Sequence, residues 1–310
     1  MQPLELYIHI PFCVKKCAYC DFLSGPAGEK EKEEYVKMLV DEIRNCPDTV
    51  QNYRVISIFF GGGTPSLLTG EQIGRLMDTV REIFTLDEDA EITMEMNPGT
   101  VTEEKLRKYR QAGVNRLSIG LQSVNDEELR LLGRIHTYEE FREAYHLARA
   151  NGFSNINVDL ISAIPGQTVE SWRRTLEQVM ALSPEHISAY SLILEEGTTF
   201  YKKYVEDEAK EGPKLPDEDA ERQMYWDTET LMEKNGYHRY EISNYAKEGY
   251  ACRHNLGYWE RIPYLGFGIG AASLVPGDLI GKCRKLEGKM SRYTNPDQLR
   301  EYAHSYRNKF

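Results

Sequence analysis

Long apolar runs are absent from this sequence of 310 residues. No stretch reaches the roughly 18 consecutive apolar residues that indicate a membrane-spanning helix. The first ten residues, MQPLELYIHI, also lack the basic start, apolar stretch and small-residue cleavage site of a secretory signal peptide. We therefore expect a cytoplasmic protein, in which thiols stay reduced and grouped cysteines indicate metal binding or chemistry rather than disulfides.

Positive charge is also scarce. Lysine and arginine number 38 against 49 aspartates and glutamates, which gives a formal net charge of −11 at pH 7. Non-specific binding to nucleic acid and adhesion to an anionic membrane both reward an excess of Lys and Arg. The charge balance therefore argues against nucleic acid as a partner and against direct membrane binding.

Internal repeats and low-complexity tracts are absent as well, and the chain instead alternates between two patterns. Short apolar, β-branched runs, which predict strands, lie at 6–10, 55–60, 90–96, 115–121, 155–161 and 186–194. Amphipathic stretches, which predict helices, lie at 28–45, 71–84, 103–112, 126–133, 138–150 and 168–182. This alternation predicts an α/β fold with a parallel sheet covered by helices. Six units fit an open or incomplete barrel as well as a doubly wound sheet, and periodicity does not choose between them.

The alternation stops at an acidic, proline-containing stretch, EDEAKEGPKLPDEDAE (206–221). We place a domain boundary there, so that residues 1–205 form the α/β domain and residues 206–310 a smaller second region. The second region begins with an amphipathic helix at 217–235 and continues with a segment rich in glycine and aromatic residues, HNLGYWERIPYLGFGIGAAS. Its last 35 or so residues are basic and polar and show little periodicity.

Three cysteines, Cys13, Cys17 and Cys20, stand in YIHIPFCVKKCAYCDF (7–22) with the spacing C-x3-C-x2-C. Structural zinc closes its tetrahedron with a fourth protein ligand, and disulfides need an even number of cysteines. His9 is an alternative fourth ligand for zinc, although it lies inside a predicted strand. A [4Fe–4S] cluster instead uses three thiolates and leaves one iron open. The spacing therefore favours a cluster over zinc.

Two further expectations concern cysteine chemistry. Lys15 and Lys16 lie between the first two cysteines of the motif, and we expect their charge to lower the pKa of the thiols. The remaining cysteines, Cys46, Cys252 and Cys283, are scattered along the chain. They are expected to be small, buried, apolar side chains.

The motif C-x3-C-x2-C, with an aromatic residue before the third cysteine, resembles the cluster motif of the radical S-adenosylmethionine (SAM) superfamily. Further blocks are together similar to the anaerobic coproporphyrinogen oxidase family: GGGTPS (61–66), EMNPG (95–99), RLSIGLQS (116–123), LLGRIHT (131–137), NVDLISAIPGQT (157–168), GYHRYEISNYA (236–246) and RHNLGYW (253–259). The resemblance covers nearly the whole chain. It implies a partial (β/α)6 radical SAM barrel that binds SAM and carries a [4Fe–4S] cluster on the three cysteines.

The resemblance also implies which residues hold SAM. Glycines after a strand let the backbone approach a ligand closely, and the family uses the position of Gly62 for the SAM amino group, with Gly63 and Thr64 near a second SAM. A carboxylate at Glu95 suits an amino group or a ribose. The other matching positions are Gln122, Arg134 and Asp159, at or beyond strand ends, and the aromatic Tyr7 and Tyr19, of which Tyr19 would stack on adenine. We expect these residues at the carboxyl ends of the strands, where barrel ligands bind.

Two branches of the family share these blocks. The decarboxylases of coproporphyrinogen III carry a long N-terminal arm and a further cysteine two residues after the third. Here the motif begins at Cys13 and Phe22 stands at that later position, so the chain is more similar to the haem chaperones. The block HNLGYW is associated with haem in that branch and implies His254 as a haem ligand. The aromatic residues expected to line the haem pocket are Tyr258, Trp259, Tyr264 and Phe267.

The implied function is a haem chaperone with a [4Fe–4S] cluster and SAM, which passes haem to an unidentified acceptor protein. Any membrane contact would be peripheral and made through that acceptor. The alternative is an oxygen-independent coproporphyrinogen III oxidase, and a weaker one is a radical SAM enzyme acting on nucleic acid, against which the acidic balance counts. The chain departs from the chaperones at Ala272–Ser273, where His-Ser is usual, and its end at residue 310 predicts an incomplete C-terminal domain.

Overall fold

The structure is a computed structural model that describes residues 1–207, 212–277, 279 and 289–305. Six parallel strands lie side by side in chain order at its centre. They are β1 (Gln2–Ile10), β2 (Tyr53–Gly62), β3 (Thr85–Met96), β4 (Arg116–Gln122), β5 (Ile156–Ser162) and β6 (His186–Ser191). In the described part of the chain, β1 and β6 do not pair with each other, because each bonds on its free side to a later strand. The predicted incomplete barrel is therefore confirmed.

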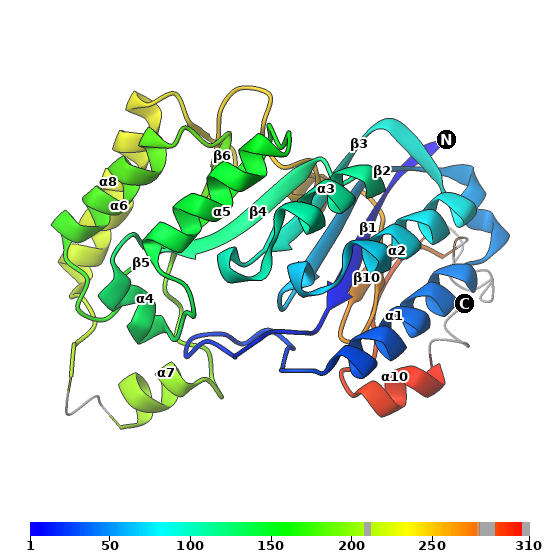
Figure 1. Ribbon diagram of the computed structural model, residues 1–310, viewed down its shortest axis with the longest axis horizontal. Coiled ribbons are helices and arrows are strands. Elements are labelled where there is room, and N and C mark those ends of the chain that lie inside the picture. Colours follow the sequence, from blue (N-terminus) through cyan, green and yellow to red (C-terminus); the bar gives the residue numbers. More distant parts are fainter. Residues whose placement is uncertain (208–211, 278, 280–288, 306–310) are drawn as a thin grey trace.

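Helices connect these strands and cover the outer face of the sheet (Figure 1). They are α1 (Glu29–Arg44), α2 (Gly70–Ile83), α3 (Glu103–Ala112), α4 (Asp126–Leu132), α5 (Tyr138–Ala150) and α6 (Val169–Ala181), with short 3-10 turns at Asp48–Asn52, Pro65–Leu67 and Pro98–Thr100. Thr69, Thr137 and Thr168 each accept a hydrogen bond from a backbone N–H three residues on, at the start of a helix. Such caps satisfy N–H groups that have no partner inside the helix. The six predicted helices are confirmed, within a few residues at their ends.

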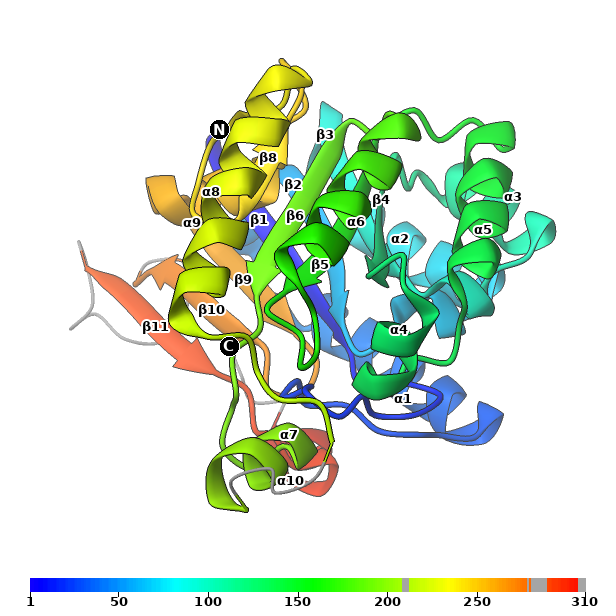
Figure 2. The same ribbon diagram turned by 90° about the vertical axis from the view of Figure 1, so that its left-hand side faces the viewer.

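Residues after 205 extend the same sheet on both sides. Their elements follow α7 (Thr199–Tyr201) and a π-helical turn (Lys202–Glu206), and are α8 (Glu218–Lys234), β7 (His238–Arg239), β8 (Asn244–Ala246), α9 (Arg253–Glu260), β9 (Tyr264–Phe267), β10 (Ala272–Pro276), β11 (Met290–Thr294) and α10 (Leu299–Ser305). Strand β8 pairs with β6, and β9 pairs with β1 (Figure 2), which gives a sheet of eleven strands. The boundary after residue 205 stays a prediction, and strands from both sides of it share one sheet.

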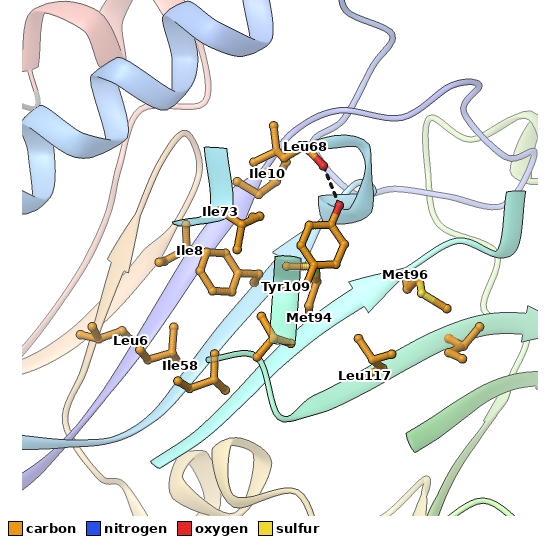
Figure 3. Packing of buried hydrophobic residues seen from close by; sticks show 14 of the residues in the cluster. Leu6, Ile8, Ile10, Ile58, Leu68, Ile73, Met94, Met96, Tyr109 and Leu117 are labelled. Atoms are coloured by element: carbon orange, nitrogen blue, oxygen red, sulfur yellow. Dashed lines mark hydrogen bonds between the residues drawn. The ribbon is translucent and has the colours of Figure 1, made fainter. Parts of the chain in front are cut away.

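Most of the hydrophobic core lies between the sheet and its covering helices. Figure 3 shows the part where strand side chains meet α2 and α3: Leu6, Ile8, Ile10, Ile58, Leu68, Ile73, Met94, Met96, Tyr109 and Leu117. The Tyr109 hydroxyl is satisfied within this core, because it donates to the carbonyl of Leu68 at 2.6 Å. Burying one aliphatic side chain of this kind contributes about 1.5–3 kcal/mol. The packed outer face thus fixes where the strands end, and the predicted site residues stand at those ends.

Three smaller expectations can be compared with the structure. The sixth strand ends at Ser191 rather than at residue 194, although Leu192 still donates to the carbonyl of Ser162 in the neighbouring β5. Cys252 is fully buried as expected, Cys46 is half-buried, and Cys283 lies outside the described residues. No helix in the described part of the chain is both long enough and apolar enough to cross a membrane.

Candidate functional site

The carboxyl ends of the parallel strands surround a cavity of about 1190 Å³, which we call the mouth. Its lining comes from the loop after β1, the ends of β2 to β6, helix α8 and the segment before β8. The predicted site residues that line it are Cys13, Cys17, Tyr19, Cys20, Gly62, Gly63, Thr64, Glu95, Gln122, Arg134 and Asp159. Positions spread over five strand–helix units therefore meet in one place, as expected for ligands of a parallel barrel.

The three cysteines lie on the loop between β1 and α1, and backbone hydrogen bonds hold that loop in place. The N–H of Cys13 donates to the carbonyl of Gly25 at 3.0 Å, which ties the start of the loop to its end. Ala18 donates to the carbonyl of Leu132 and accepts from the N–H of Phe200, both at 2.9 Å. These anchors come from distant parts of the chain, and they fix the segment that carries the thiols.

Both ring nitrogens of His9, the alternative zinc ligand, form hydrogen bonds with other groups. Its Nε2 lies 2.9 Å from the carbonyl of Leu23, which can only accept, so Nε2 carries the proton. Its Nδ1 then accepts from the hydroxyl of Tyr7 at 3.0 Å. Burial lowers the pKa of His9, which favours this neutral form. His9 therefore holds the end of the cysteine loop, and Tyr7, predicted beside SAM, supports His9 without lining the mouth.

The electrostatic setting of the thiols differs from the expectation. Burial raises the pKa of Cys13 and Cys20, and the charge of Lys16 opposes this only in part. Lys16 does lower both pKa values, as predicted for the loop lysines, but burial outweighs its charge and the net shift is upward. Arg134 instead comes nearest to a thiol, with Nη1 at 3.8 Å from Sγ of Cys17.

The donor set fits a cluster better than a single metal ion. Among the described residues, no three His, Cys, Asp or Glu side chains are grouped so as to hold one ion. The three thiols line a shared cavity, and the nearest imidazole is engaged elsewhere. Three thiolates with no fourth protein ligand match a [4Fe–4S] cluster that keeps one iron open.

The glycines after β2 bring backbone into the mouth at points where a side chain would not fit. Gly62 has φ of +114°, and a Cβ there would lie 2.6 Å from the ring of His9. A Cβ on Gly63 would lie 2.5 Å from the carbonyl oxygen of Phe12. The N–H of Gly62 donates to Oε2 of Glu95 at 3.0 Å. Glycine is therefore required at both positions, and it ties the end of β2 to the carboxylate of β3.

Two carboxylates, Glu95 of β3 and Asp159 of β5, face the mouth with neutral hydrogen-bond partners. Asp159 accepts from Oγ of Ser118 at 3.0 Å and from Nδ2 of Asn157 at 2.7 Å. Burial, reinforced by the charge of Asp159, raises the pKa of Glu95 to about 8. Burial also raises the pKa of Asp159. Both carboxylates would be stabilised by a cationic ligand, which is the chemistry of an amino group or a sulfonium.

Gln122 reaches the mouth through an unusual backbone conformation. Its φ is 78°, a left-handed value that residues with a side chain rarely adopt and that costs on the order of 1 kcal/mol or more. The next residue holds it, since Oγ of Ser123 donates to the buried carboxylate of Glu128 at 2.6 Å. Glu128 also accepts from Ser171 and Gln167, so the loops after β4 and β5 share one anchor.

Arg134 and Tyr19 complete the part of the mouth nearest the cysteines. Arg134 donates to the carbonyl of Gly120 at 2.5 Å and to Oδ1 of Asn97 at 3.1 Å. Its Nε is buried and has no hydrogen-bond partner among the residues that the structure describes, and a buried guanidinium N–H of this kind suits an anionic group such as a carboxylate. Tyr19 lines the mouth and packs against a second small core cluster that contains Leu132 and Phe200.

His254 does not line the mouth. It is only 2% exposed on α9, where Nδ1 lies 2.8 Å from Oγ of Ser57 and Nε2 lies 3.0 Å from the hydroxyl of Tyr258. Its ring stacks on Phe59 with centroids 5.2 Å apart. In this arrangement both ring nitrogens are hydrogen bonded, so iron ligation by His254 would require one of these bonds to break. The role of His254 in haem binding stays a prediction.

The aromatic residues expected to form a haem pocket with His254 are not gathered around one cavity. Phe267 is fully buried in the core, whereas Tyr258 and Trp259 are 41% and 60% exposed. Tyr264 packs edge-on against Tyr258, with centroids 4.7 Å apart. These side chains belong to the packing of α9 and β9 on the sheet, and none of them lines the mouth.

The sequence reasoning missed the outer part of the mouth. Large apolar side chains line it there: Tyr190, Leu192 and Ile193 at the end of β6, Tyr225 and Trp226 on α8, and Ile242 before β8. We call this set the outer wall. No sequence signal marked it, because each residue is an ordinary member of a helix or loop. Asn97, which orients Arg134, was within reach of sequence reasoning, since it belongs to the block EMNPG after β3.

A second polar layer lies deeper in the barrel, and we call it the floor. Its inward-facing residues, one from each parallel strand, are Glu5, Ser57, Glu91, Arg116, Asn157 and His186. Helix α9 covers this layer. Both oxygens of Glu91 accept from backbone N–H groups at the start of α9, those of Arg253 and His254. A Cβ on Gly257 would lie 2.1 Å from Oε1 of Glu5, so α9 packs directly on the floor.

Comparisons with known proteins agree with this geometry. Residues 7–179 match the family described as the Radical SAM superfamily. The Heme chaperone HemW of Escherichia coli (strain K12) is 44% identical over 87% of this chain and 70% of that protein. The Heme chaperone HemW of Haemophilus influenzae is 39% identical over 97% of this chain and 76% of that protein.

A solved structure shares nearly the whole fold. It is described as coproporphyrinogen III oxidase (HemN) from Escherichia coli, a radical SAM enzyme. It superposes with a TM-score of 0.82 at 28% identity, and covers 99% of this chain and 70% of that one. The chain therefore belongs to the radical SAM superfamily and, within it, to the family of the haem chaperones.

Proposed function

We propose that this protein is a haem chaperone that contains a [4Fe–4S] cluster and SAM, binds haem and passes it to an acceptor protein. The observation that carries the proposal is the 44% identity with the Heme chaperone HemW of Escherichia coli, against 28% with the coproporphyrinogen III oxidase of the same organism. Phe22 agrees with this, since it stands where the decarboxylases carry a further cysteine. The cytoplasmic location expected from the sequence is part of the proposal.

In this proposal the cluster is held by Cys13, Cys17 and Cys20. When bound, it supplies the electron on which radical SAM chemistry depends. The chain contributes a loop anchored at both ends and a guanidinium, that of Arg134, 3.8 Å from the thiol of Cys17. It also keeps His9 away from the thiols through the bond to Leu23, so that no imidazole closes the fourth position.

SAM would occupy the inner part of the mouth, between the cysteine loop and the strand ends. Glu95 and Asp159 would bind its cationic and hydroxyl groups, since both carboxylates lack a charged hydrogen-bond partner. The unpaired Nε of Arg134 would bind its carboxylate. The remaining proposed contacts are the backbone of Gly62, Gly63 and Thr64, the side chain of Gln122, and the ring of Tyr19 against adenine.

The experiment that tests the proposal measures haem binding and decarboxylation on the same preparation. The chain is reconstituted anaerobically with iron and sulfide, haem is titrated in, and the Soret band is followed. In parallel, the protein is incubated with SAM, a reductant and coproporphyrinogen III, and protoporphyrinogen is sought, with the Escherichia coli oxidase as positive control. Saturable haem binding without turnover supports the chaperone. Turnover of coproporphyrinogen III would replace it by the alternative, an oxygen-independent coproporphyrinogen oxidase, whose fold this chain shares.

A further inference from the structure

The mouth is larger than its proposed inner ligands need. Ligand pockets usually measure about 300–1,000 Å³, whereas the cavity measures about 1190 Å³. The predicted SAM residues line only one side of it, and the rest of the cavity lies on the side of β6, α8 and the segment before β8.

The outer wall that bounds this remaining space is apolar and solvent-exposed. Ile193 is 68% exposed, Ile242 66%, Trp226 55%, Tyr225 45% and Tyr190 43%. Single exposed apolar side chains are normal on a protein surface, but a contiguous group along one cavity marks a binding site. The rings of Tyr225 and Trp226 lie edge-on with centroids 5.8 Å apart, which presents faces and edges to a flat ligand.

Cationic side chains flank the outer wall. Arg222 lines the mouth from α8. Its ion pair with Asp219 is weak, because the side chains of Arg222 and Asp219 are 61% and 89% exposed. Lys15 and Lys16 line the mouth from the cysteine loop. Asp21, Glu195, Glu218 and Glu221 line this side of the mouth as well, and of these Glu221 accepts from the hydroxyl of Ser191. The wall thus combines a broad apolar surface with a rim of both charges, on which Arg222 can pair with a carboxylate of a flat apolar ligand.

Histidine does not line the mouth anywhere in the described part of the chain. The predicted haem ligand, His254, is buried in the floor with both ring nitrogens hydrogen bonded. A tetrapyrrole in the mouth would therefore be held by contact of its faces and edges rather than by a bond from imidazole to iron.

We propose that the outer wall, centred on Trp226, Ile193 and Ile242, is the binding site for the tetrapyrrole. Apolar contact with the macrocycle supplies most of the affinity of the protein for this ligand. Arg222 would pair with a propionate. The inference rests on the proposed function, because it locates the haem of that proposal. It places the macrocycle in the same cavity as the cluster and SAM, and away from the block HNLGYW on α9.

The test separates wall contact from iron ligation. The reconstituted chain is titrated with haem and, separately, with metal-free protoporphyrin IX, whose fluorescence reports binding. We expect the two dissociation constants to agree within about threefold, because the wall contacts the macrocycle and does not bind the metal. Binding of the metal-free macrocycle that is about a hundredfold weaker would overturn the inference.

The matched variants are Trp226→Ala and Trp259→Ala, since both tryptophans are exposed, at 55% and 60%, and only Trp226 lines the mouth. We expect Trp226→Ala to weaken both ligands at least about tenfold and Trp259→Ala to change them less than about twofold. Ile193→Asp is a second variant of the wall, and unchanged SAM binding shows that each variant is folded. Unchanged haem affinity in Trp226→Ala and Ile193→Asp, or its loss in His254→Ala alone, would overturn the inference.

Two other outcomes count against it as well. If the wall instead joins two copies of the chain, wild type is a dimer and Trp226→Ala a monomer by sedimentation, with haem affinity unchanged. If wild type binds neither macrocycle while it still binds iron and SAM, the proposed function fails, and the inference fails with it. That result differs from one in which wild type binds haem and the wall variants bind it equally well.

Discussion

The mouth and the floor are built from the same six strands, yet their buried polar groups meet opposite conditions. In the floor, side chains face one another and helix α9. In the mouth, they face an open cavity. Both layers contain a buried carboxylate, and burial raises the pKa of Glu5 in the floor and of Glu95 in the mouth to about 8. A perturbed pKa therefore does not distinguish the two layers.

Hydrogen-bond partners do not distinguish them either, because in the described part of the chain each layer holds buried side-chain atoms without a partner: Oε2 of Glu5 and Nε of Arg116 in the floor, and Nε of Arg134 in the mouth. In the floor, Nδ1 of His186 donates to Oδ1 of Asn157 at 2.6 Å and Nε2 accepts from the hydroxyl of Tyr240 at 2.8 Å. Asn157 also donates to Asp159, so one residue belongs to both layers. The polar groups of the floor pack against α9, whereas those of the mouth face the cavity. Buried polarity indicates function here only where a cavity adjoins it.

The largest expected difference between the layers is in the iron content after a cysteine is replaced in each. Cys17→Ala removes a proposed cluster ligand, and we expect iron after anaerobic reconstitution to fall from about four per chain to less than one. Cys252→Ala removes a buried thiol of the floor that donates to Glu91, and it should keep about four irons per chain. Iron assay and the absorption spectrum of the cluster measure both. Four irons retained in Cys17→Ala would contradict the assignment of the motif.

The next largest difference is expected when an arginine is replaced in each layer, and it concerns SAM affinity and stability. Arg134→Ala should weaken SAM binding at least about tenfold, since losing one partner of a buried charged contact costs about 2–5 kcal/mol. Arg116→Met should leave SAM binding within about twofold but lower the free energy of unfolding by about 3–5 kcal/mol, because the variant leaves the buried Glu91 without its nearby positive charge. Calorimetry and urea denaturation measure the two effects. Equal SAM affinities in wild type and Arg134→Ala would show that the SAM site is elsewhere.

The raised carboxylate pKa values predict a pH effect shared by both layers. Folding raises the pKa of Glu5 and Glu95 from 4.5 to about 8, so between these values the folded state holds protons that the unfolded state has lost. The contribution of these two carboxylates to the free energy of unfolding should therefore fall as the pH rises from 5 to 8. Below pH 6.5 the buried His136, His186 and His254 contribute with the opposite sign, because burial lowers their pKa values. Glu5→Gln and Glu95→Gln should each flatten this dependence, by on the order of 2–4 kcal/mol across that range.

Urea denaturation at several pH values tests this effect, and SAM binding separates the layers. Glu95→Gln should weaken SAM binding, whereas Glu5→Gln should not, because only Glu95 lines the mouth. A pH dependence that stays parallel to wild type in both variants would contradict the raised pKa values.

The smallest expected effect concerns the hydrogen bond that closes the floor. Tyr258→Phe removes the hydroxyl 3.0 Å from Nε2 of His254 and should lower the free energy of unfolding by about 1 kcal/mol. Haem affinity should stay within about twofold of wild type. A tenfold change in haem affinity, with unchanged stability, would instead indicate that His254 leaves the floor to bind iron.

Local sequence patterns were sufficient to predict the parallel strands, whereas the barrel and the set of residues in the inner part of the mouth were predicted from the resemblance to the radical SAM family. Apolar runs mark buried parallel strands, and glycine, glutamate or aspartate just after such a run marks a strand end that faces a ligand. Gly62, Glu95 and Asp159 therefore gather in one cavity, as expected.

The parts that depend on distant partners could not be predicted in this way. Strands β7 to β9 have only two to four residues each and exist because they pair with β1, β6 or each other. The environment of His254 depends on Ser57 and Phe59, far away in the sequence. The net direction of the pKa shifts at Cys13 and Cys20 could not be predicted either, because burial, which charge spacing does not reveal, outweighs the lowering by Lys16.

The pairing of β1 with β9 has a consequence for biosynthesis. Glu5 pairs with Tyr264, so one edge of the first strand to be made stays open until almost the whole sheet has been translated. At about 5–20 residues per second, that wait lasts on the order of tens of seconds. An unpaired strand edge is a template for association with other chains. A nascent chain released before β9 is complete would carry the whole cysteine motif beside an unprotected edge, and we expect it to aggregate rather than retain partial function.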